Sequence, residues 1–136
     1  MARSITEISE HDQLILMMTR YFKELGYTDI KADLSGWLKP ESIYYTNDPN
    51  TKYIPDLTCF DTNGIYVILE AETCSTFNDQ HTHNQFKIFR DHATNNHGRF
   101  EVVVPRVCSG REGRQSINNV ANSWGINLDN VWTPSN

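Results

Sequence analysis

The chain has few cysteines, and they are poorly placed for the structures that cysteines usually build. There are three in 136 residues, at positions 59, 74 and 108, with no Cys-x-x-Cys pair among them. An odd count at wide spacing favours neither a disulfide framework nor a zinc knuckle. Cys59 lies in an apolar run, which predicts a small side chain of the core.

Long apolar runs, a basic excess and internal repeats are also missing. No apolar segment approaches the length of a membrane span, and the first residues do not resemble a signal peptide. We therefore expect a cytoplasmic protein without membrane contacts. The net charge of −5 gives no overall positive field, so binding of nucleic acid would need a local basic patch. A chain of this length without linkers predicts a single domain, residues 1–136.

What the sequence does contain is a clear β-hairpin signal. Two apolar runs, residues 53–60 and 65–72, flank a short turn at residues 61–64. The turn ends in Asn63-Gly64, a dipeptide that favours tight hairpins. These features predict two antiparallel strands.

Three acids lie in the predicted hairpin. Asp56 is in the first run, and Glu70 and Glu72 end the second. Residues two apart share a strand face, so Glu70 and Glu72 point the same way, and strand pairing brings Asp56 beside them. Like charges repel and half-buried charges cost free energy, which a divalent cation would relieve. The alternative is that each acid simply ends a strand and points into water.

Helical periodicity marks residues 10–25 and 79–94. In the second of these helices, Lys87 faces water, while His81 and Gln85 lie along one edge of the apolar stripe. The stripe, which we expect to be buried, consists of Thr82, Phe86, Phe89 and Ala93.

The remaining segments complete an α/β pattern. In chain order they are weak strands at residues 27–34 and 43–45, a buried strand at 100–105, a loop at 106–113, a helix containing Ile117, Val120, Ala121 and Trp124, and a short last strand at 129–133. A strand, a helix and a second strand in succession require a parallel crossover. The prediction is therefore an α/β fold, a mixed sheet flanked by helices on both faces.

This order of elements, together with the acids, resembles the PD-(D/E)XK nuclease superfamily. The resemblance covers roughly residues 10–110 and implies a restriction-endonuclease-like fold of order αβββαβα. Pro55-Asp56 corresponds to the first part of the motif and Glu70-Ala71-Glu72 to its acid-x-Lys part. Gln85 and Phe89 match a Gln-x-x-x-aromatic signature that some members carry on the following helix.

One position departs from the motif, because Glu72 stands where the family has lysine. A Glu-x-Glu variant occurs in some active restriction endonucleases, so the change is compatible with catalysis. It removes the ammonium that would orient or polarise the attacking water. Lys87 is an alternative source of that ammonium, although its expected position on the solvent side argues against this role.

The resemblance implies a metal-dependent nuclease that hydrolyses phosphodiesters. Asp56 and Glu70, with the backbone carbonyl of Ala71, would bind Mg²⁺ or Mn²⁺. Glu72 would accept a proton or hold a second ion. The remaining implied site residues are Gln85 and His81, which would orient water or phosphate, and Glu10, which would add another acid.

The implied partner is nucleic acid, DNA rather than RNA. Arg106, Arg111 and Arg114 form the only notable basic cluster and would contact phosphates. A solvated loop diluted by Glu112 is the equal alternative for these arginines. Many small nucleases of this fold are dimers, which leaves a homodimer open.

Two other functions compete with a nuclease. The first is a catalytically inactive nuclease-fold module that binds nucleic acid or a protein partner. The second, weaker one is a zinc-dependent hydrolase built on His81 and His83 with His92 or His97. Histidines two apart on a helix diverge by about 200°, whereas zinc sites on helices use residues four apart.

Overall fold

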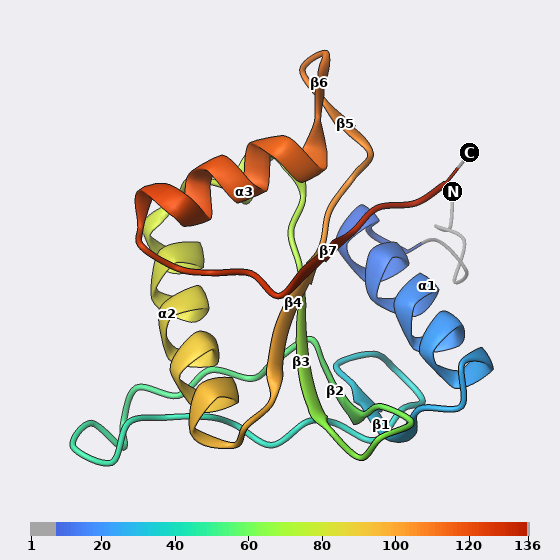
Figure 1. Ribbon diagram of the computed structural model, residues 1–136, viewed down its shortest axis with the longest axis vertical. Helices are drawn as coiled ribbons and strands as arrows, with labels where there is room; N and C mark the ends of the chain where they lie inside the picture. Colours follow the sequence, from blue (N-terminus) through green and yellow to red (C-terminus); the bar gives the residue numbers. More distant parts are fainter. Residues whose placement is uncertain (1–7, 136) are drawn as a thin grey trace, which may run out of the picture.

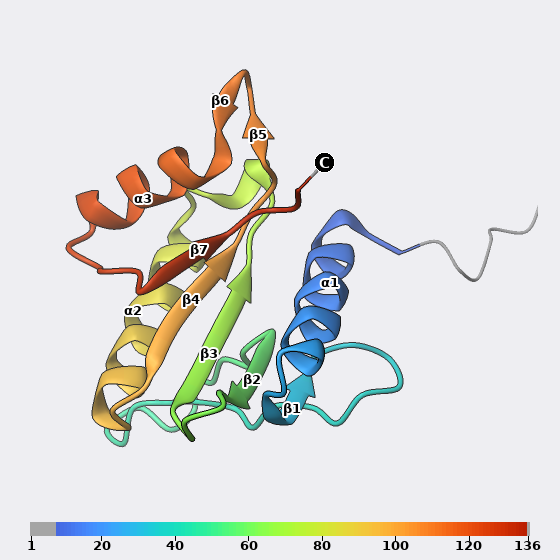
Figure 2. The same cartoon turned by 45° about the vertical axis from the view of Figure 1, so that its right-hand side comes forward.

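The computed structural model describes residues 8–135, which form a five-stranded sheet between helices. Helix α1 covers one face of the sheet, and α2 and α3 lie on the other (Figures 1 and 2). The elements are α1 (Glu10–Glu24), β1 (Thr28–Ala32), β2 (Leu57–Phe60), β3 (Tyr66–Ala71), the 3₁₀ helix η1 (Cys74–Thr76), α2 (Gln80–Asn95), β4 (Arg99–Val103), β5 (Val107–Cys108), β6 (Arg111–Glu112), α3 (Gly113–Ser123) and β7 (Asn130–Trp132).

The sheet is mixed, with the strand order β1-β2-β3-β4-β7. Strands β1, β2 and β3 are antiparallel, and the predicted hairpin pairs Leu57 with Leu69 and Phe60 with Tyr66. Strands β4 and β7 continue the sheet in parallel, with α2 and α3 as their crossover connections. The α/β fold predicted from the sequence, a mixed sheet flanked by helices on both faces, is therefore confirmed.

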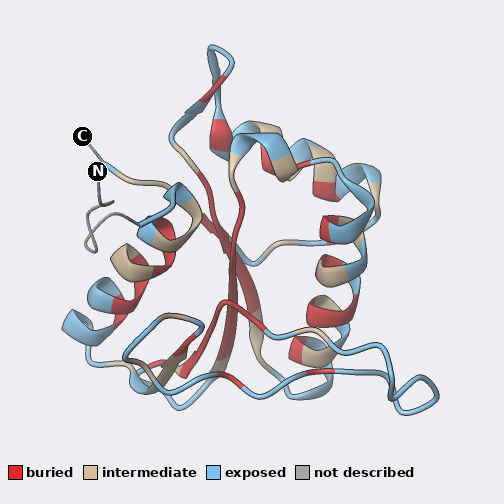
Figure 3. Ribbon diagram, turned by 180° about the vertical axis from the view of Figure 1, so that it is seen from behind, coloured by how far each residue is buried: buried red, intermediate tan, exposed pale blue. Residues whose placement is uncertain are grey.

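Two apolar layers hold the helices to the sheet. Successive residues of β3 alternate between them, so Leu69 packs toward α1 and Ile68 packs toward α2 and α3. Figure 3 shows the result, with the central strands buried and the outer helix faces exposed. On α2, Phe86 and Phe89 are fully buried and Lys87 is exposed, as the periodicity predicted.

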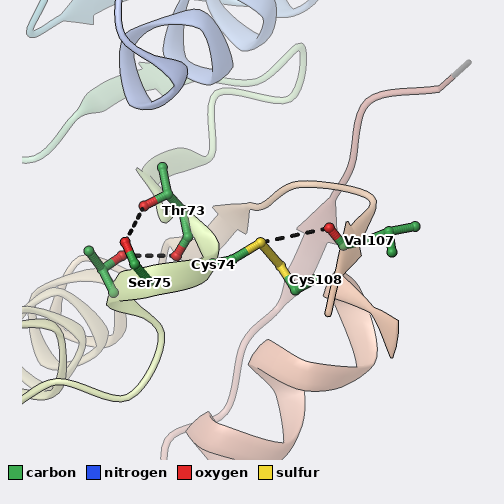
Figure 4. Close-up of a disulfide and its surroundings, with 6 residues drawn as sticks. Thr73, Cys74, Ser75, Val107 and Cys108 are labelled. Carbon is green, nitrogen blue, oxygen red and sulfur yellow. Dashed lines mark hydrogen bonds between the residues drawn. A yellow bond between two sulfur atoms is a disulfide. The ribbon is translucent and has the colours of Figure 1, made fainter. Parts of the chain in front are cut away.

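The expectation of no disulfide is wrong, because Cys74 and Cys108 are joined (Figure 4). They are 34 residues apart in sequence, yet their Cα atoms are 5.6 Å apart. The reason is the topology: Cys74 follows β3 and Cys108 follows β4, and neighbouring parallel strands end at the same edge of a sheet. Disulfides persist mainly in oxidising compartments, so this bond does not support the predicted cytoplasmic location. That location stays a prediction.

Two segments differ from the expected local structure. Residues 106–113 were expected to form a loop, but β5 and β6 pair there as a small antiparallel hairpin. The run at residues 43–45 makes a single bridge, Ile43 to Tyr53, in place of a strand. No helix among residues 8–135 combines the length and the apolar character needed to cross a bilayer.

A buried ion-pair network lies beneath α1 on the sheet. The Arg99 guanidinium donates to Asp61 (2.6 Å) and to Glu101 (2.8 Å), and the Trp132 indole NH donates to the other oxygen of Glu101 (2.8 Å). Glu101 is only 2% exposed. Asp61 also accepts the NH groups of Asn63 and Ile65, so the network joins the β2–β3 turn to β4 and β7.

Replacing Arg99 by methionine should therefore strongly destabilise the protein. The substitution keeps the apolar stem but leaves two buried carboxylates without their cation, which costs about 3–5 kcal/mol. Urea unfolding at neutral pH measures this change. Lys31→Met is the control, because Lys31 reaches only Asp29, at 4.0 Å and near the surface, and such pairs contribute at most about 1 kcal/mol. Equal losses in the two variants would contradict a special role for Arg99.

Candidate functional site

A pocket of about 420 Å³ opens where β3 ends, between the first turns of α1 and α2. The predicted site residues Asp56, Glu70, Ala71 and Glu72 line it together with His81 and Gln85 from α2. His11, Asp33, Ile54, Thr73, Thr76, Asp79 and Thr82 complete the lining.

Asp56 and Glu70 hold each other through backbone hydrogen bonds. The Asp56 NH donates to Glu70 Oε2 (2.6 Å), and the Ala71 NH donates to Asp56 Oδ2 (2.8 Å). Each carboxylate thus takes the place of a ladder carbonyl just beyond the last β2–β3 pair, Leu57 with Leu69. The two acids are fixed side by side at the mouth of the hairpin.

The backbone carbonyl of Ala71 is a further group that we expect to face the pocket. In a strand, the NH and the carbonyl of one residue point to the same side. Because the Ala71 NH points toward Asp56, we expect the Ala71 carbonyl to face that side as well. The residue opposite it would be Pro55, which has no NH to donate.

The acids are buried beyond what carboxylates normally tolerate. Glu70 is 1%, Glu72 5% and Asp56 7% exposed. Burial, and then the charge of Asp56, raises the pKa of Glu70 well above its usual range. Burial also raises the pKa of Glu72 to about 7, against the opposing effect of its hydrogen bonds from Thr76 (2.7 Å) and Thr82 (3.1 Å).

His11 is a site residue that the sequence prediction missed. Its Nε2 lies 3.2 Å from Asp56 Oδ2 and its Nδ1 lies 3.2 Å from Asp12 Oδ1. The hydrogen bond with Asp56 raises the pKa of His11 to about 9, although burial works in the opposite direction. Glu10, the acid proposed for this helix, is exposed and does not line the pocket. The sequence does contain a signal that His11 faces inward, because it precedes Leu14, Ile15 and Met18 at the spacing of the buried face of α1.

The histidines proposed for zinc lie apart. The His81 ring is near Tyr53, His83 stacks on Trp124 with ring centres 4.4 Å apart, and His92 lies against Tyr66. Across residues 8–135, no group of three or more His, Cys, Asp or Glu side chains is arranged as a ready metal site. The geometry gives the zinc hydrolase no support.

The donor set around Asp56 suits a hard cation completed by water. Asp56 and Glu70 each use one oxygen for a backbone NH, and their other oxygens accept no hydrogen bond from the described residues. Two carboxylate oxygens and a backbone carbonyl are ligands of the kind that Mg²⁺ accepts, with waters filling the remaining positions. The Glu72 carboxylate accepts hydrogen bonds from Thr76 and Thr82, so it does not join Asp56 and Glu70 as a third metal ligand.

The three predicted arginines are exposed and lie close together in the chain. Arg106 precedes β5, Arg111 is in β6, and Arg114 is in the first turn of α3. Figure 2 shows the β5–β6 hairpin projecting at the end of the sheet where β3 finishes and α1 begins. The disulfide ties this hairpin to η1, two residues after Glu72.

The chain is similar to solved structures of DNA-repair endonucleases, at low sequence identity. No protein-family model matches the chain, and no curated protein matches it. Two solved structures are similar: the EndoMS-dsDNA2 complex, with 14% identity and a TM-score of 0.41, and a repair endonuclease from Pyrococcus abyssi, with 16% identity and a TM-score of 0.45. The alignments cover 99% and 98% of this chain but only 51% and 50% of those chains. The chain thus spans about half the length of each, and similarity at this level does not establish a function.

The buried Glu72 predicts an unusual dependence of stability on pH in metal-free protein. Its pKa is 4.5 ordinarily and about 7 in the folded state, so the folded state keeps a proton that the unfolded state loses. Its contribution to the free energy of unfolding should fall as pH rises from 4.5 to 7, by on the order of 3 kcal/mol. Urea unfolding with chelator at pH 5 and pH 7.5 measures this change.

Glu72→Gln should remove that part of the pH dependence, because glutamine does not ionise. Glu24→Gln is the control, since Glu24 is exposed at the end of α1 and its loss should leave the wild-type profile unchanged. Identical profiles for wild type and Glu72→Gln would show that Glu72 ionises normally in the folded protein.

Proposed function

We propose that the protein is a metal-dependent nuclease that hydrolyses phosphodiester bonds at the pocket of Asp56 and Glu70. The observation that carries the proposal is the pair of buried carboxylates, locked together by reciprocal backbone bonds and opening into one pocket. A carboxylate with a purely structural role at a strand end is not stabilised by a second buried acid beside it. The PD-(D/E)XK resemblance, carried by Pro55-Asp56 and Glu70-Ala71-Glu72, points to the same chemistry.

In this proposal Asp56, Glu70 and the Ala71 carbonyl hold Mg²⁺ or Mn²⁺. The bound ion supplies polarisation of the scissile phosphate and acidification of a water. Glu72 accepts the proton of the attacking water, a role that suits a carboxylate whose pKa is raised to about 7. Thr76 and Thr82 keep its carboxylate from rotating. Gln85 and His81, one helical turn apart at the pocket wall, orient the water or the phosphate.

The proposed substrate is nucleic acid, and the proposed contact surface is the β5–β6 hairpin with Arg106, Arg111 and Arg114. Contacts from arginines to phosphates carry no sequence information, which fits weakly specific or structure-selective cleavage. The preference for DNA over RNA, and a homodimeric state, rest on the family resemblance alone.

A second candidate function is a nuclease-fold module that binds nucleic acid or a protein without cutting. The observation that favours it is the lining of the pocket, which includes no lysine or arginine from the described residues. Glu72 has replaced the expected ammonium, and Lys87 points away into solvent.

Asp56→Asn and Glu70→Gln separate these functions. Both amides keep an oxygen that can accept the backbone NH, and both remove like-charge repulsion, so the metal-free melting temperature should stay the same or rise. Wild-type protein should melt at a higher temperature with Mn²⁺, by mass action, and both variants should lose this gain. Cleavage of labelled single-stranded, double-stranded and branched DNA and of RNA should need Mg²⁺ or Mn²⁺ and should stop in both variants.

Asp33→Asn is the matched control, because Asp33 is an exposed acid at the rim of the same pocket. It should retain the response to Mn²⁺. A wild-type protein that shows no metal response, with a lower melting temperature in both site variants, would favour the module that does not cut.

The arginines should control affinity for nucleic acid without affecting the metal site. Arg111→Gln with Arg114→Gln should weaken binding of every sequence and reduce the slope of log affinity against log salt by about 1 per arginine. Fluorescence anisotropy at several salt concentrations measures both effects. Arg20→Gln with Lys23→Gln, both exposed on α1, removes the same two charges as the control. Equal weakening by the control would mean that only net charge matters.

A further inference from the structure

His11 lines the pocket and contacts an acid of the site, yet the mechanism proposed above gives it no role. His11 lies in the first turn of α1, on a different element from the acids, and its ring is half-buried against them. Its Nε2 is 3.2 Å from Asp56 Oδ2. An ionised carboxylate can only accept hydrogen bonds, so the contact requires a proton on Nε2.

We propose that His11 is a positioning residue that fixes the Asp56 carboxylate for binding of the divalent cation. This inference rests on the proposed function. Asp56 Oδ2 accepts two hydrogen bonds, one from the Ala71 NH of β3 and one from the His11 ring of α1. Donors from two separate elements restrict the rotation of the carboxyl group, and Oδ1 is the oxygen left for the pocket. The positions of β3 and α1 therefore determine where that oxygen points.

The His11 ring is itself held in place. Ser9 caps the helix by accepting the Asp12 NH (3.1 Å), which fixes the first turn of α1. The Asp12 carboxylate lies 3.2 Å from the other ring nitrogen. Below the ring, Leu14 and Ile15 anchor the same helix face in the core. A donor held at both ring nitrogens is what an orienting residue needs, because a mobile ring would not restrain Asp56.

The contact with Asp56 needs a proton on Nε2, which the neutral Nε2–H tautomer and the imidazolium both carry. The contact with Asp12 needs a proton on Nδ1 as well, so the two contacts together belong to the imidazolium. Outer-shell donors to metal-binding carboxylates and histidines commonly change metal affinity by 10–100-fold when they are removed. A purely structural His11 would change the melting temperature but not the affinity of the folded protein for metal.

The test is calorimetric titration of Mn²⁺ into the full-length protein and its variants at a temperature where all are folded. His11→Leu keeps bulk but removes both nitrogens, and it should weaken Mn²⁺ binding 10–100-fold. His11→Gln places an amide NH near the position of Nε2 and should restore affinity to within about threefold of the wild type. If the leucine variant does not fold, His11→Ala replaces it. Glu10→Gln, at an exposed residue of the same helical turn that does not line the pocket, is the control and should bind like the wild type.

The results for the His11 variants test the positioning role, and the result for the wild type tests the metal site itself. Wild-type affinity in His11→Leu, or a higher affinity, would overturn the positioning role and leave the metal site intact. Equal loss in His11→Leu and His11→Gln would overturn it, because an amide NH would then fail to replace the NH of the ring as the donor to Asp56. A wild-type protein that binds no Mn²⁺ would overturn the proposed function and this inference with it. If the wild type cleaves DNA, His11→Leu should lower kcat while KM for DNA stays the same.

Discussion

The hydrogen bond from the Asp56 NH to Glu70, and its counterpart from Ala71 to Asp56, determine the arrangement of the whole site. A β-ladder normally continues until its backbone groups reach water or a turn. Here the ladder of β2 and β3 ends at Leu57 and Leu69, and Pro55 cannot extend it. Two side-chain carboxylates satisfy the NH groups that the ladder leaves. The hydrogen bonds that satisfy these backbone NH groups are therefore also the bonds that bring the two carboxylates together.

That arrangement carries an electrostatic cost, and the surrounding elements reduce it only in part. The hydroxyl groups of Thr76 and Thr82 donate hydrogen bonds to Glu72, and the His11 ring donates one to Asp56. Glu70 is the most deeply buried of the three acids, and its pKa is the one raised well above its usual range. The network around Arg99 shows how the same fold treats acids that are only structural. There, a guanidinium compensates Asp61 and Glu101 directly. The contrast between the two clusters supports the proposal that the acids of the pocket bind a ligand.

The sequence predicted the features that depend on local periodicity and on neighbours in the chain. The hairpin at residues 53–72, the helices α1 and α2 and the burial of Phe86 and Phe89 all follow from spacing within a few residues. The disulfide was missed because its cysteines meet only through the parallel pairing of β3 and β4, which no local pattern reveals. His11 was missed for a related reason. Its periodic position was visible, but its partner Asp56 is 45 residues away.

The disulfide also links two parts of the molecule that the proposed function uses, the pocket wall at η1 and the β5–β6 hairpin. On one side, Cys74 belongs to η1, the short helix that presents Thr76 to Glu72. On the other side, Cys108 ends β5, in the hairpin that holds Arg111. A hairpin of two residues per strand has little stability of its own, so this covalent bond, together with the contacts between the hairpin and α3, helps to fix its position. In the proposed function, this bond helps to fix the segment that carries Arg106, Arg111 and Arg114 relative to the pocket of Asp56 and Glu70.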